Sequence, residues 1–337
     1  MLRLLLFPFS IIYDLITRTR NHLYNTGHKP SFRFDVPVIS IGNLNIGGSG
    51  KTPMTEYIIR LLSASHRLAT LSRGYGRRSK GFRIASDKDD ATTIGDEPYQ
   101  MFRKFRDAIV VAVGEDRAFA IPNILQHHDE VEAIILDDAF QHRSVLPHLS
   151  ILLTEYSHPF TRDYVLPAGN LRESRKGASR ADVIVVTKCP DERTQMEFLT
   201  ASIRRYAGNK PVFFSKLKYG DLVPFGNLSS PTGKIILVTG IARPGPLVDY
   251  MKTRFEILKH LEYGDHHRFT ELEVEDAHYE AQQMSDIVLV TTEKDMVRLR
   301  SFKSVASHPW FYIPVQMEFI KNGSEFDMLV ARQLTRD

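Results

Sequence analysis

A glycine-rich loop, set between an apolar run and an amphipathic stretch, constrains the fold of this chain more than any other feature. The apolar run 38–41 leads into Gly47-Gly48-Ser49-Gly50-Lys51-Thr52-Pro53, and helical spacing continues to Leu62. Glycines let consecutive backbone N–H groups turn toward phosphate oxygens, a lysine reaches the β- and γ-phosphates, and a threonine offers its hydroxyl to Mg²⁺. The order of strand, loop and helix therefore predicts a phosphate-binding loop in an α/β fold.

The loop and the first helical turn supply the predicted nucleotide-contacting residues. These are Asn45, Ile46, Gly47, Gly48, Ser49, Gly50, Lys51 and Thr52. Asn45 stands where the usual pattern has glycine, and asparagine adopts a left-handed backbone more readily than most residues. Pro190, in Thr187-Lys188-Cys189-Pro190, occupies the place where a guanine-specificity motif requires an acid. We therefore expect ATP, with Lys51 acting in catalysis.

A second apolar run, 133–136, ends in the adjacent acids Asp137 and Asp138. Phosphoryl transfer in this class of protein needs a metal-side carboxylate from a strand near the phosphate loop. We expect both acids in a Mg²⁺ site with Thr52, and the sequence leaves open which acid is nearer the metal.

Short β-branched runs alternate with longer helical stretches along the chain. The runs are 36–41, 68–71, 109–113, 133–136, 149–153, 182–187, 212–215, 234–239, 257–261, 286–291 and 310–314. Near-continuous apolar strands are typical of parallel sheets covered on both faces. Eleven strands are many for one sheet, and 337 residues suffice for about two domains at roughly 150 residues each. The stretch 156–178, rich in Pro, Gly and Arg, is the best candidate for the crossing between two sheets.

The basic excess of the chain lies at its N-terminus. Positions 1–33 carry five basic residues against Asp14 alone, which equals the net charge of +4 of the whole chain. No nucleic-acid-binding signature accompanies this charge, so we expect no nucleic-acid partner. The lone Cys189 excludes an internal disulfide framework and fits a reducing compartment.

The same terminus carries an apolar run over 2–16 that Pro8, Ser10 and Asp14 interrupt. This run is shorter than the ~20 apolar residues of a membrane-spanning helix, and no small-residue cleavage site of a secretory signal follows it. Arg18 and Arg20 could meet anionic lipid phosphates while the apolar side chains enter the headgroup boundary. We therefore expect an amphipathic helix on a membrane surface. A helix docked on the protein's own core is the open alternative.

At this point several ordered blocks of sequence resemble the tetraacyldisaccharide 4′-kinases, the lipid A kinases, over nearly the whole chain. The blocks are Gly42-Asn43-Leu44, the phosphate loop, Ser72-Arg73-Gly74-Tyr75-Gly76, Gly95-Asp96-Glu97-Pro98, Asp137-Asp138-Ala139-Phe140-Gln141-His142-Arg143, Leu166-Pro167-Ala168-Gly169-Asn170-Leu171-Arg172-Glu173 and Thr292-Glu293-Lys294-Asp295. Ala139 and Asn170 replace residues that are more often Gly and Pro in that family, and neither supplies a functional side chain.

The resemblance implies ATP-dependent phosphorylation of the 4′-hydroxyl of a tetraacylated glucosamine disaccharide 1-phosphate in lipid A biosynthesis. It implies Mg²⁺, a peripheral position at the cytoplasmic face of the inner membrane, and no obligate protein partner. It also implies two α/β/α domains of Rossmann-like, P-loop type with mainly parallel sheets, joined by a small β linker. The boundaries that we expect are 1–30 for the membrane-associating helix, 31–155 for the P-loop domain, 156–178 for the linker, 179–310 for the second α/β domain and 311–337 for a segment returning to the first.

Three further site residues follow from the resemblance. Asp96 matches the acid proposed as base for the sugar hydroxyl, although spacing alone favours a helix cap. His266, after Asp265, matches the partner that orients this base, whereas two adjacent histidines by themselves make no metal site. Glu173 matches a metal-side acid, with a surface ion pair to Arg172 or Arg175 as the alternative.

The sequence leaves open the roles of Arg117 and of the block 292–295, and it leaves open two rival functions. Arg117 either steadies phosphates or covers the sheet, and Thr292-Glu293-Lys294-Asp295 either lines the cleft at a strand end or forms a structural ion pair. A nucleotide-switched membrane-binding protein would have no need of a proton acceptor such as Asp96. A soluble small-molecule kinase would lack the basic amphipathic terminus.

Overall fold

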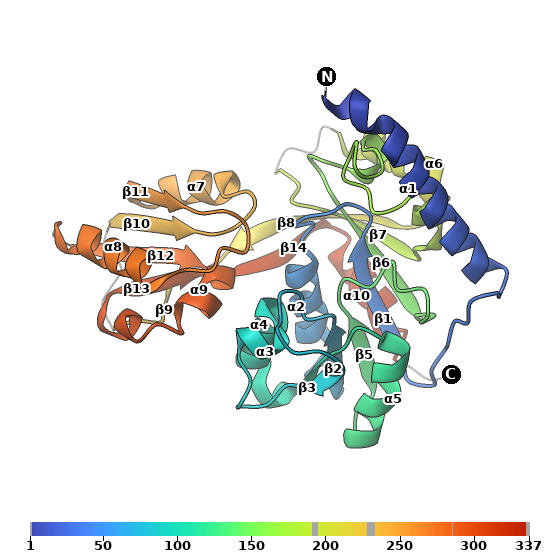
Figure 1. Ribbon diagram of the computed structural model, residues 1–337, viewed down its shortest axis with the longest axis horizontal. Helices are drawn as coiled ribbons and strands as arrows, with labels where there is room; N and C mark the ends of the chain where they lie inside the picture. Colours follow the sequence, from blue (N-terminus) through green and yellow to red (C-terminus); the bar gives the residue numbers. More distant parts are fainter. Residues whose placement is uncertain (1, 191–194, 228–232, 285, 335–337) are drawn as a thin grey trace.

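The predicted strands form two separate sheets, each covered by helices (Figure 1). This architecture comes from a computed structural model that describes residues 2–190, 195–227, 233–284 and 286–334. All eleven expected runs are strands, with ends shifted by up to four residues. The prediction of two α/β domains with mainly parallel sheets is confirmed.

The first sheet has nine strands in the order β14-β8-β7-β6-β1-β5-β2-β4-β3. Its strands are parallel to their neighbours except at the two edges, where β3 and β14 run antiparallel to β4 and β8. Their bounds are β1 (Val38–Asn43), β2 (Leu68–Ser72), β3 (Arg83–Ile84), β4 (Ile109–Val113), β5 (Ala133–Leu136), β6 (Leu149–Glu155), β7 (Val183–Thr187), β8 (Val212–Tyr219) and β14 (Val315–Lys321).

Helices cover both faces of this sheet because its strands bury alternate side chains on opposite sides. Ile39 and Ile41 of β1 pack with one helical cluster, and Val38 packs with another. The first cluster includes α2 (Lys51–Leu62), α4 (Asp96–Phe105) and α10 (Gly323–Ala331), and the opposite face carries α5 (Arg117–His127) and α6 (Met196–Ala207). Shorter helices are α3 (Ala91–Ile94), η1 (Arg106–Ala108), η2 (Phe160–Arg162) and η3 (Arg175–Arg180).

The second sheet has five strands in the order β11-β10-β12-β13-β9, of which only β9 is antiparallel to its neighbour. The strands are β9 (Val223–Pro224), β10 (Lys234–Thr239), β11 (Glu256–Glu262), β12 (Ile287–Thr292) and β13 (Trp310–Ile313). One face carries α7 (Gly245–Lys252), and the other carries α8 (Glu271–Gln282) and η4 (Lys303–Ser307). Helix α9 (Glu293–Leu299) begins directly after β12.

The chain crosses between the two sheets at different places from those that the sequence indicates. Strands β7 and β8 belong to the first sheet. Residues 156–178 therefore connect two strands of that sheet, and the prediction that they link the two domains is wrong. The chain leaves after β8 and returns at Pro314, and β8 and β14 pair as an antiparallel ribbon between the domains (Figure 1). Residues 156–178 lack a regular hydrophobic period because they wrap over the first domain rather than link two domains.

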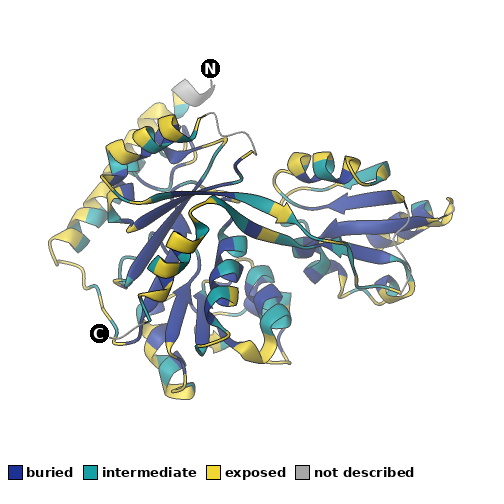
Figure 2. Ribbon diagram, turned by 180° about the vertical axis from the view of Figure 1, so that it is seen from behind, coloured by how far each residue is buried: buried dark blue, intermediate teal, exposed yellow. Residues whose placement is uncertain are grey.

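Helix α1 (Leu2–Asn25) lies on the outside of the first domain with its apolar side chains exposed (Figures 1 and 2). Leu5, Phe9, Ile11, Ile12, Leu15 and Ile16 are each at least 58% exposed. Within the described part of the chain, no helix combines the length and apolar character needed to span a bilayer.

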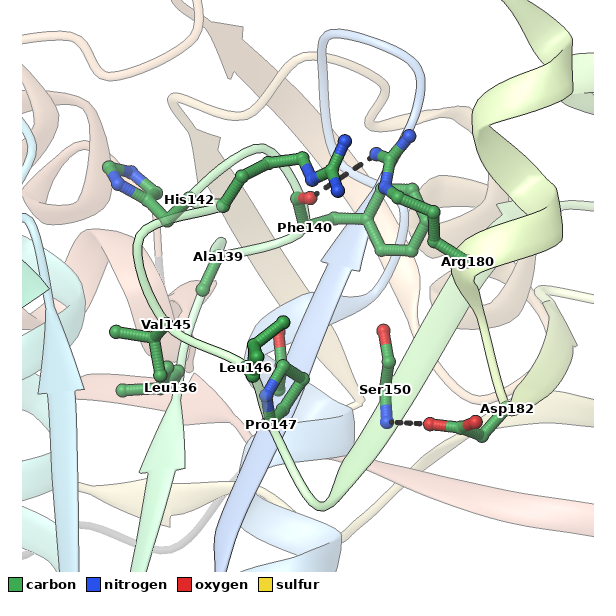
Figure 3. A pocket seen from close by; sticks show the side chains of 12 residues that line it. Leu136, Ala139, Phe140, His142, Val145, Leu146, Pro147, Ser150, Arg180 and Asp182 are labelled. Carbon is green, nitrogen blue, oxygen red and sulfur yellow. Dashed lines mark hydrogen bonds between the residues drawn. The ribbon is translucent and has the colours of Figure 1, made fainter. Parts of the chain in front are cut away.

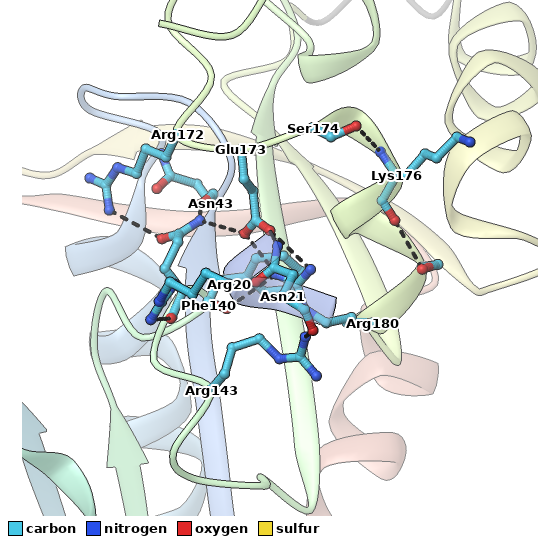
Figure 4. Close-up of polar contacts among 12 residues, drawn as sticks. Arg20, Asn21, Asn43, Phe140, Arg143, Arg172, Glu173, Ser174, Lys176 and Arg180 are labelled. Atoms are coloured by element: carbon cyan, nitrogen blue, oxygen red, sulfur yellow. Dashed lines mark hydrogen bonds and ion pairs between the residues drawn. The ribbon is translucent and has the colours of Figure 1, made fainter. Parts of the chain in front are cut away.

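Polar contacts, rather than an apolar seam, hold α1 on the domain (Figure 4). Ser10 accepts a hydrogen bond from the Ala168 N–H (2.9 Å), and Arg20 donates to the carbonyl of Gln141 (2.9 Å). Asn21 donates to the Glu173 carboxylate (2.6 Å). The polar face of the helix is therefore docked on the first domain and its apolar face is exposed, while membrane binding stays a prediction.

Candidate active site

The phosphate loop connects β1 to α2, at the carboxyl end of a central strand. Gly50 is the N-cap of α2 with φ +84°, a left-handed conformation that favours glycine. Asn45, at the position usually held by glycine, donates a side-chain hydrogen bond to Asp163 (3.0 Å). The Thr187 hydroxyl donates to the Ser49 carbonyl (2.8 Å) from the end of β7. The loop is thus fixed from two neighbouring segments before any nucleotide binds.

Lys51 and Asp138 form the charged pair nearest to the loop. The Lys51 Nζ lies 3.7 Å from Asp138 Oδ1. Arg172 binds the same carboxylate, with its Nη1 at 2.8 Å from Oδ1 and 2.9 Å from Oδ2. Burial opposes ionisation of Asp138, but these two cations hold its pKa below the ordinary value. Asp138 is therefore an ionised acid.

Asp137 is in a different electrostatic state from its neighbour. It is 6% exposed, and its Oδ1 accepts hydrogen bonds from the Asp138 N–H (3.0 Å) and the Thr55 hydroxyl (3.4 Å). Burial, followed by the charges of Glu97 and Asp138, raises the pKa of Asp137 to about 7. Three acids therefore share the space beside the start of α2, and Lys51 and Arg172 supply the nearby positive charge.

This donor set fits a hard divalent cation. The Thr52 hydroxyl at the start of α2 donates to Glu97 (3.3 Å), which brings a hydroxyl and three carboxylates into one neighbourhood. Mg²⁺ prefers oxygen ligands and keeps several waters and phosphate oxygens in its shell, so it needs only one or two protein ligands. Accordingly, the described residues contain no cluster of three or more ligating side chains of the kind that binds a metal without other ligands.

Asp96 opens helix α4, and backbone packing sets its position. Gly95, with φ +96°, is the N-cap residue, so Asp96 is the first residue of the helix and not its cap. A Cβ on Gly95 would lie 2.9 Å from the Tyr75 carbonyl oxygen, so the Gly74-Tyr75 turn packs directly against the start of α4. The capping alternative for Asp96 therefore has no support in the geometry.

His266 reaches Asp96 from the second domain. Its Nδ1 lies 3.6 Å from Asp96 Oδ2, and its ring packs against Tyr75 with centroids 5.4 Å apart. The Nε2 atom is 3.0 Å from the Lys294 Nζ. Because an ammonium has only donors, Nε2 must accept, and the proton of the neutral ring is on Nδ1, facing Asp96.

The block that contains Asp295 lies at the end of β12, and its contacts show what its residues do. The Thr292 hydroxyl and the Gly240 N–H both donate to Asp295 Oδ2 (2.7 and 2.9 Å), and Arg298 binds Oδ1 (2.8 Å). Glu293 faces the first domain, where Lys104 joins it to Glu56. The block thus supplies both a structural ion pair and residues at the domain boundary.

The structure places Glu173 differently from the metal-side position that the resemblance implies. Its Oε1 accepts from Arg180 (2.7 Å) and Gln141 (3.2 Å), and its Oε2 accepts from Asn21 (2.6 Å) and Arg180 (3.0 Å) (Figure 4). These four contacts occupy the carboxylate, which is the centre of the α1 docking network rather than a metal ligand. The alternative pairs with Arg172 and Arg175 are absent too, because Arg172 turns to Asp138.

Arg117 is fully buried behind the same acids. It donates to the carbonyls of Gly114 and Glu115, and its Nε and Nη2 have no hydrogen-bond partner among the described residues. Burial lowers its pKa to about 10, while the charges of Asp137 and Asp138 oppose that shift. The arrangement favours a role within the sheet, and the phosphate contact stays a prediction.

Sequence reasoning missed four residues that the tertiary structure brings to the site. They are Glu97 beside Thr52, Arg172 on Asp138, Thr187 on the phosphate loop and Arg298 beside Asp96. Glu97, Arg172 and Thr187 lie in blocks already noted, and Arg298 lies three residues beyond one. Their partners are distant in sequence, so no local spacing identifies the pairs.

A separate cavity lies under the connection between β5 and β6 (Figure 3). Its lining includes Phe140, Arg143 and Arg180, which also border the α1 docking network, together with Ser150 and Asp182. The phosphate loop, Asp96 and His266 do not line it. The cavity is thus distinct from the candidate active site.

Known proteins match this chain over nearly its full length. A family described as tetraacyldisaccharide-1-P 4′-kinase matches residues 2–335. Proteins named tetraacyldisaccharide 4′-kinase from Flavobacterium johnsoniae and Flavobacterium psychrophilum are 40% and 42% identical, over 99% and 97% of this chain and 98% and 95% of their own lengths. A crystal structure of LpxK from Aquifex aeolicus in complex with ATP is 30% identical, with a TM-score of 0.77 over 99% of this chain and 100% of that one.

Proposed function

Because this chain belongs to the tetraacyldisaccharide-1-P 4′-kinase family, we propose how its own residues carry out the reaction. The protein is an ATP-dependent kinase of lipid A biosynthesis that phosphorylates the 4′-hydroxyl of a tetraacylated disaccharide 1-phosphate. The open questions are which residues bind ATP, which assist the attacking hydroxyl, and which surface meets the lipid.

The phosphate loop, residues 45–52, binds the ATP phosphates. Its backbone N–H groups and the N-terminus of α2 surround the β-phosphate, and Lys51 neutralises charge on the transferred group. Thr52, Asp137 and Asp138 would hold Mg²⁺, which when bound neutralises charge on the β- and γ-phosphates. Arg172 keeps the Asp138 carboxylate fixed for this role.

Asp96 accepts the proton of the 4′-hydroxyl as that oxygen attacks the γ-phosphate. His266 donates its Nδ1 proton toward the Asp96 carboxylate and holds it in place, and Lys294 fixes the tautomer. General-base assistance typically contributes ~10²–10⁴-fold to the rate. The pair assembles only when the two domains meet, which excludes a competent site in either domain alone.

Helix α1 positions the enzyme on the cytoplasmic face of the inner membrane. Its exposed apolar side chains enter the headgroup region, and its polar face stays docked on the first domain. The acylated substrate then reaches the cleft from the same surface. Such binding is peripheral and reversible.

The approach of His266 to Asp96 across the domain boundary is the observation that carries this proposal, because a nucleotide-switched binding protein needs no such pair. The test measures transfer of radiolabelled γ-phosphate from ATP to the tetraacylated disaccharide 1-phosphate in detergent micelles. We expect Lys51→Ala to lose most of the rate at saturating Mg-ATP, whereas Lys80→Ala, at an exposed position outside any helix or strand, keeps it. Full activity of Lys51→Ala would overturn the phosphate-loop assignment.

A further inference from the structure

Arg298 of α9 faces Asp96 across the domain boundary. Its side chain is 9% exposed, and its Nε lies 3.4 Å from Asp96 Oδ2. The other two guanidinium nitrogens are held within the second domain: Nη2 by Asp295 (2.8 Å) and Nη1 by the His267 carbonyl (2.6 Å). The guanidinium thus has two anchored nitrogens and one that faces the first domain.

That third nitrogen is a buried donor without a hydrogen-bond acceptor among the described residues. Leaving a charged donor unsatisfied in a buried site costs free energy unless a compensating charge is near. Asp96 is the carboxylate that faces it from the opposite domain. Asp295 balances the charge of the guanidinium, and Asp96 is the acceptor that faces its remaining nitrogen, Nε.

Both contacts from the second domain reach the same oxygen of Asp96. His266 Nδ1 (3.6 Å) and Arg298 Nε (3.4 Å) both approach Oδ2. No described residue donates a hydrogen bond to Oδ1. This arrangement leaves one oxygen of the carboxylate free to meet a hydroxyl while the other is held.

We propose that Arg298 is a positioning residue that holds Asp96 Oδ2, so that Oδ1 receives the proton of the sugar hydroxyl. The inference rests on the proposed role of Asp96 as base. Arg298 acts through Asp96 and does not itself touch the reacting atoms.

The anchor of Arg298 is rigid because Asp295 is completely buried and holds the Gly240 N–H and the Thr292 hydroxyl on its other oxygen. Three fixed donors on one planar group are a property of arginine that lysine lacks. We therefore expect lysine at this position to keep the charge but not the geometry.

The experiment compares Arg298→Gln, Arg298→Lys, Asp96→Asn and the double variant Asp96→Asn/Arg298→Gln in the full-length enzyme. Arg300→Gln, at an exposed position one residue beyond α9, is the matched control. The kcat and the KM for ATP and for the acylated disaccharide are measured for each variant, and thermal midpoints confirm that each variant is folded.

We expect Arg298→Gln to lower kcat by about 10–100-fold, as misplacement of a reacting group does, with an ATP KM within twofold. Arg298→Lys should lose part of kcat, because it keeps the charge without the fixed geometry. In the Asp96→Asn background, Arg298→Gln should not lower kcat any further, because the carboxylate that Arg298 holds is absent. The control should match the unaltered enzyme in every respect.

Two other outcomes overturn different claims. If Asp96→Asn is inactive but Arg298→Gln keeps its full kcat, the inference about Arg298 is wrong and Asp96 can still be the base. If Asp96→Asn keeps full kcat, the role of Asp96 as base fails, and the positioning role of Arg298 fails with it. If Arg298→Gln does not fold, Arg298→Lys is used in its place. The inference is then refuted if the kcat losses of Arg298→Lys and Asp96→Asn multiply fully when the two substitutions are combined.

Discussion

Adjacent acids in this protein occupy different protonation states because their neighbours differ. Asp138 lies between Lys51 and Arg172, which keep its pKa below the ordinary value, whereas burial and the charges of Glu97 and Asp138 raise the pKa of Asp137 to about 7. A cation that binds here completes the charge balance of the site. If Asp137 holds the metal as we propose, its raised pKa makes metal binding depend on pH.

The first prediction is that binding of Mg-ATP releases a proton and tightens as pH rises from 6 to 8. Below about pH 7, Asp137 carries a proton in the free enzyme, and a divalent cation must displace it. Calorimetry at pH 6.5 in two buffers of different ionisation enthalpy measures this proton directly. Asp137→Asn should abolish the release.

Asp138→Asn is the matched control for that measurement. Asp138 is already ionised, because Lys51 and Arg172 hold its pKa down. Its replacement should weaken binding without removing the pH dependence. A binding enthalpy of the unaltered enzyme that is the same in both buffers would contradict the prediction.

At the scale of elements, helix α1 reverses the usual arrangement of an amphipathic helix. Its polar face, through Ser10 and Asn21, contacts the protein, and its apolar face is exposed. An exposed apolar stripe of this size marks an interaction surface. The helix face that the fold leaves uncovered is therefore the surface that we propose binds the membrane.

The second prediction concerns this face. Replacing Ile12, Leu15 and Ile16 with serine should reduce binding to anionic phosphatidylglycerol vesicles at least tenfold, since burying one large apolar side chain is worth about 1.5 kcal/mol or more. Flotation of the full-length protein with vesicles measures the change. The KM for micellar substrate should rise more than kcat changes.

Leu272→Ser is the control, because Leu272 is also exposed (67%) but belongs to α8 in the second domain. It should leave vesicle binding intact. Equal losses in both variants, or full retention of the triple variant, would assign membrane binding to another surface.

The third prediction concerns the contact between helix α8 and strand β13. His278 is 4% exposed and accepts a hydrogen bond from the indole N–H of Trp310 (2.8 Å), and burial lowers its pKa to about 4. A group with a lowered pKa in the folded state stabilises the fold above its unfolded pKa of 6.5, and this contribution is lost as pH falls toward 4. The second domain should therefore lose stability across that interval.

Trp310 is the one tryptophan of the chain, so its fluorescence during urea unfolding reports on this site. Replacing His278 with glutamine keeps an acceptor that does not titrate. That variant should lose less stability between pH 6.5 and 4 than the unaltered protein does. Parallel losses in the two proteins would mean that other groups dominate.

At the scale of the whole molecule, the active site forms where two domains meet. Lys104 joins Glu56 of the first domain to Glu293 of the second, and Arg243 of the second domain binds Glu155 of the first (2.7 Å). The β8–β14 ribbon is the covalent connection between these contacts. The Asp96–His266 contact is thus one of several polar contacts that join the two domains.

The fourth prediction is that Asp96→Ala and His266→Ala are coupled. Asp96→Ala should lower kcat by about 10²–10⁴-fold and leave ATP affinity nearly intact. His266→Ala should cost a similar or smaller factor, and the double variant should lose far less than the product, because the residues act as one unit. Single-turnover kinetics at saturating ATP measure the three losses. Fully multiplicative losses would indicate independent roles.

Local signals in the sequence were sufficient for the phosphate loop, the acids after β5, the eleven strands and the apolar terminal helix. Each depends on residues that are adjacent or a few positions apart, and hydrophobic period and glycine spacing record such structure directly. Asp96 and His266 needed the resemblance to a family, since their spacing alone favoured a helix cap and an ordinary histidine pair.

Only the tertiary structure decided which residues meet across long separations. It placed β7 and β8 in the first sheet, moved Glu173 from the metal to the docking of α1, and brought Arg172 to Asp138 and Arg298 to Asp96. Strand order and side-chain pairing depend on how helices and sheets pack. Packing is a property of the whole chain, so no window of the sequence contains it.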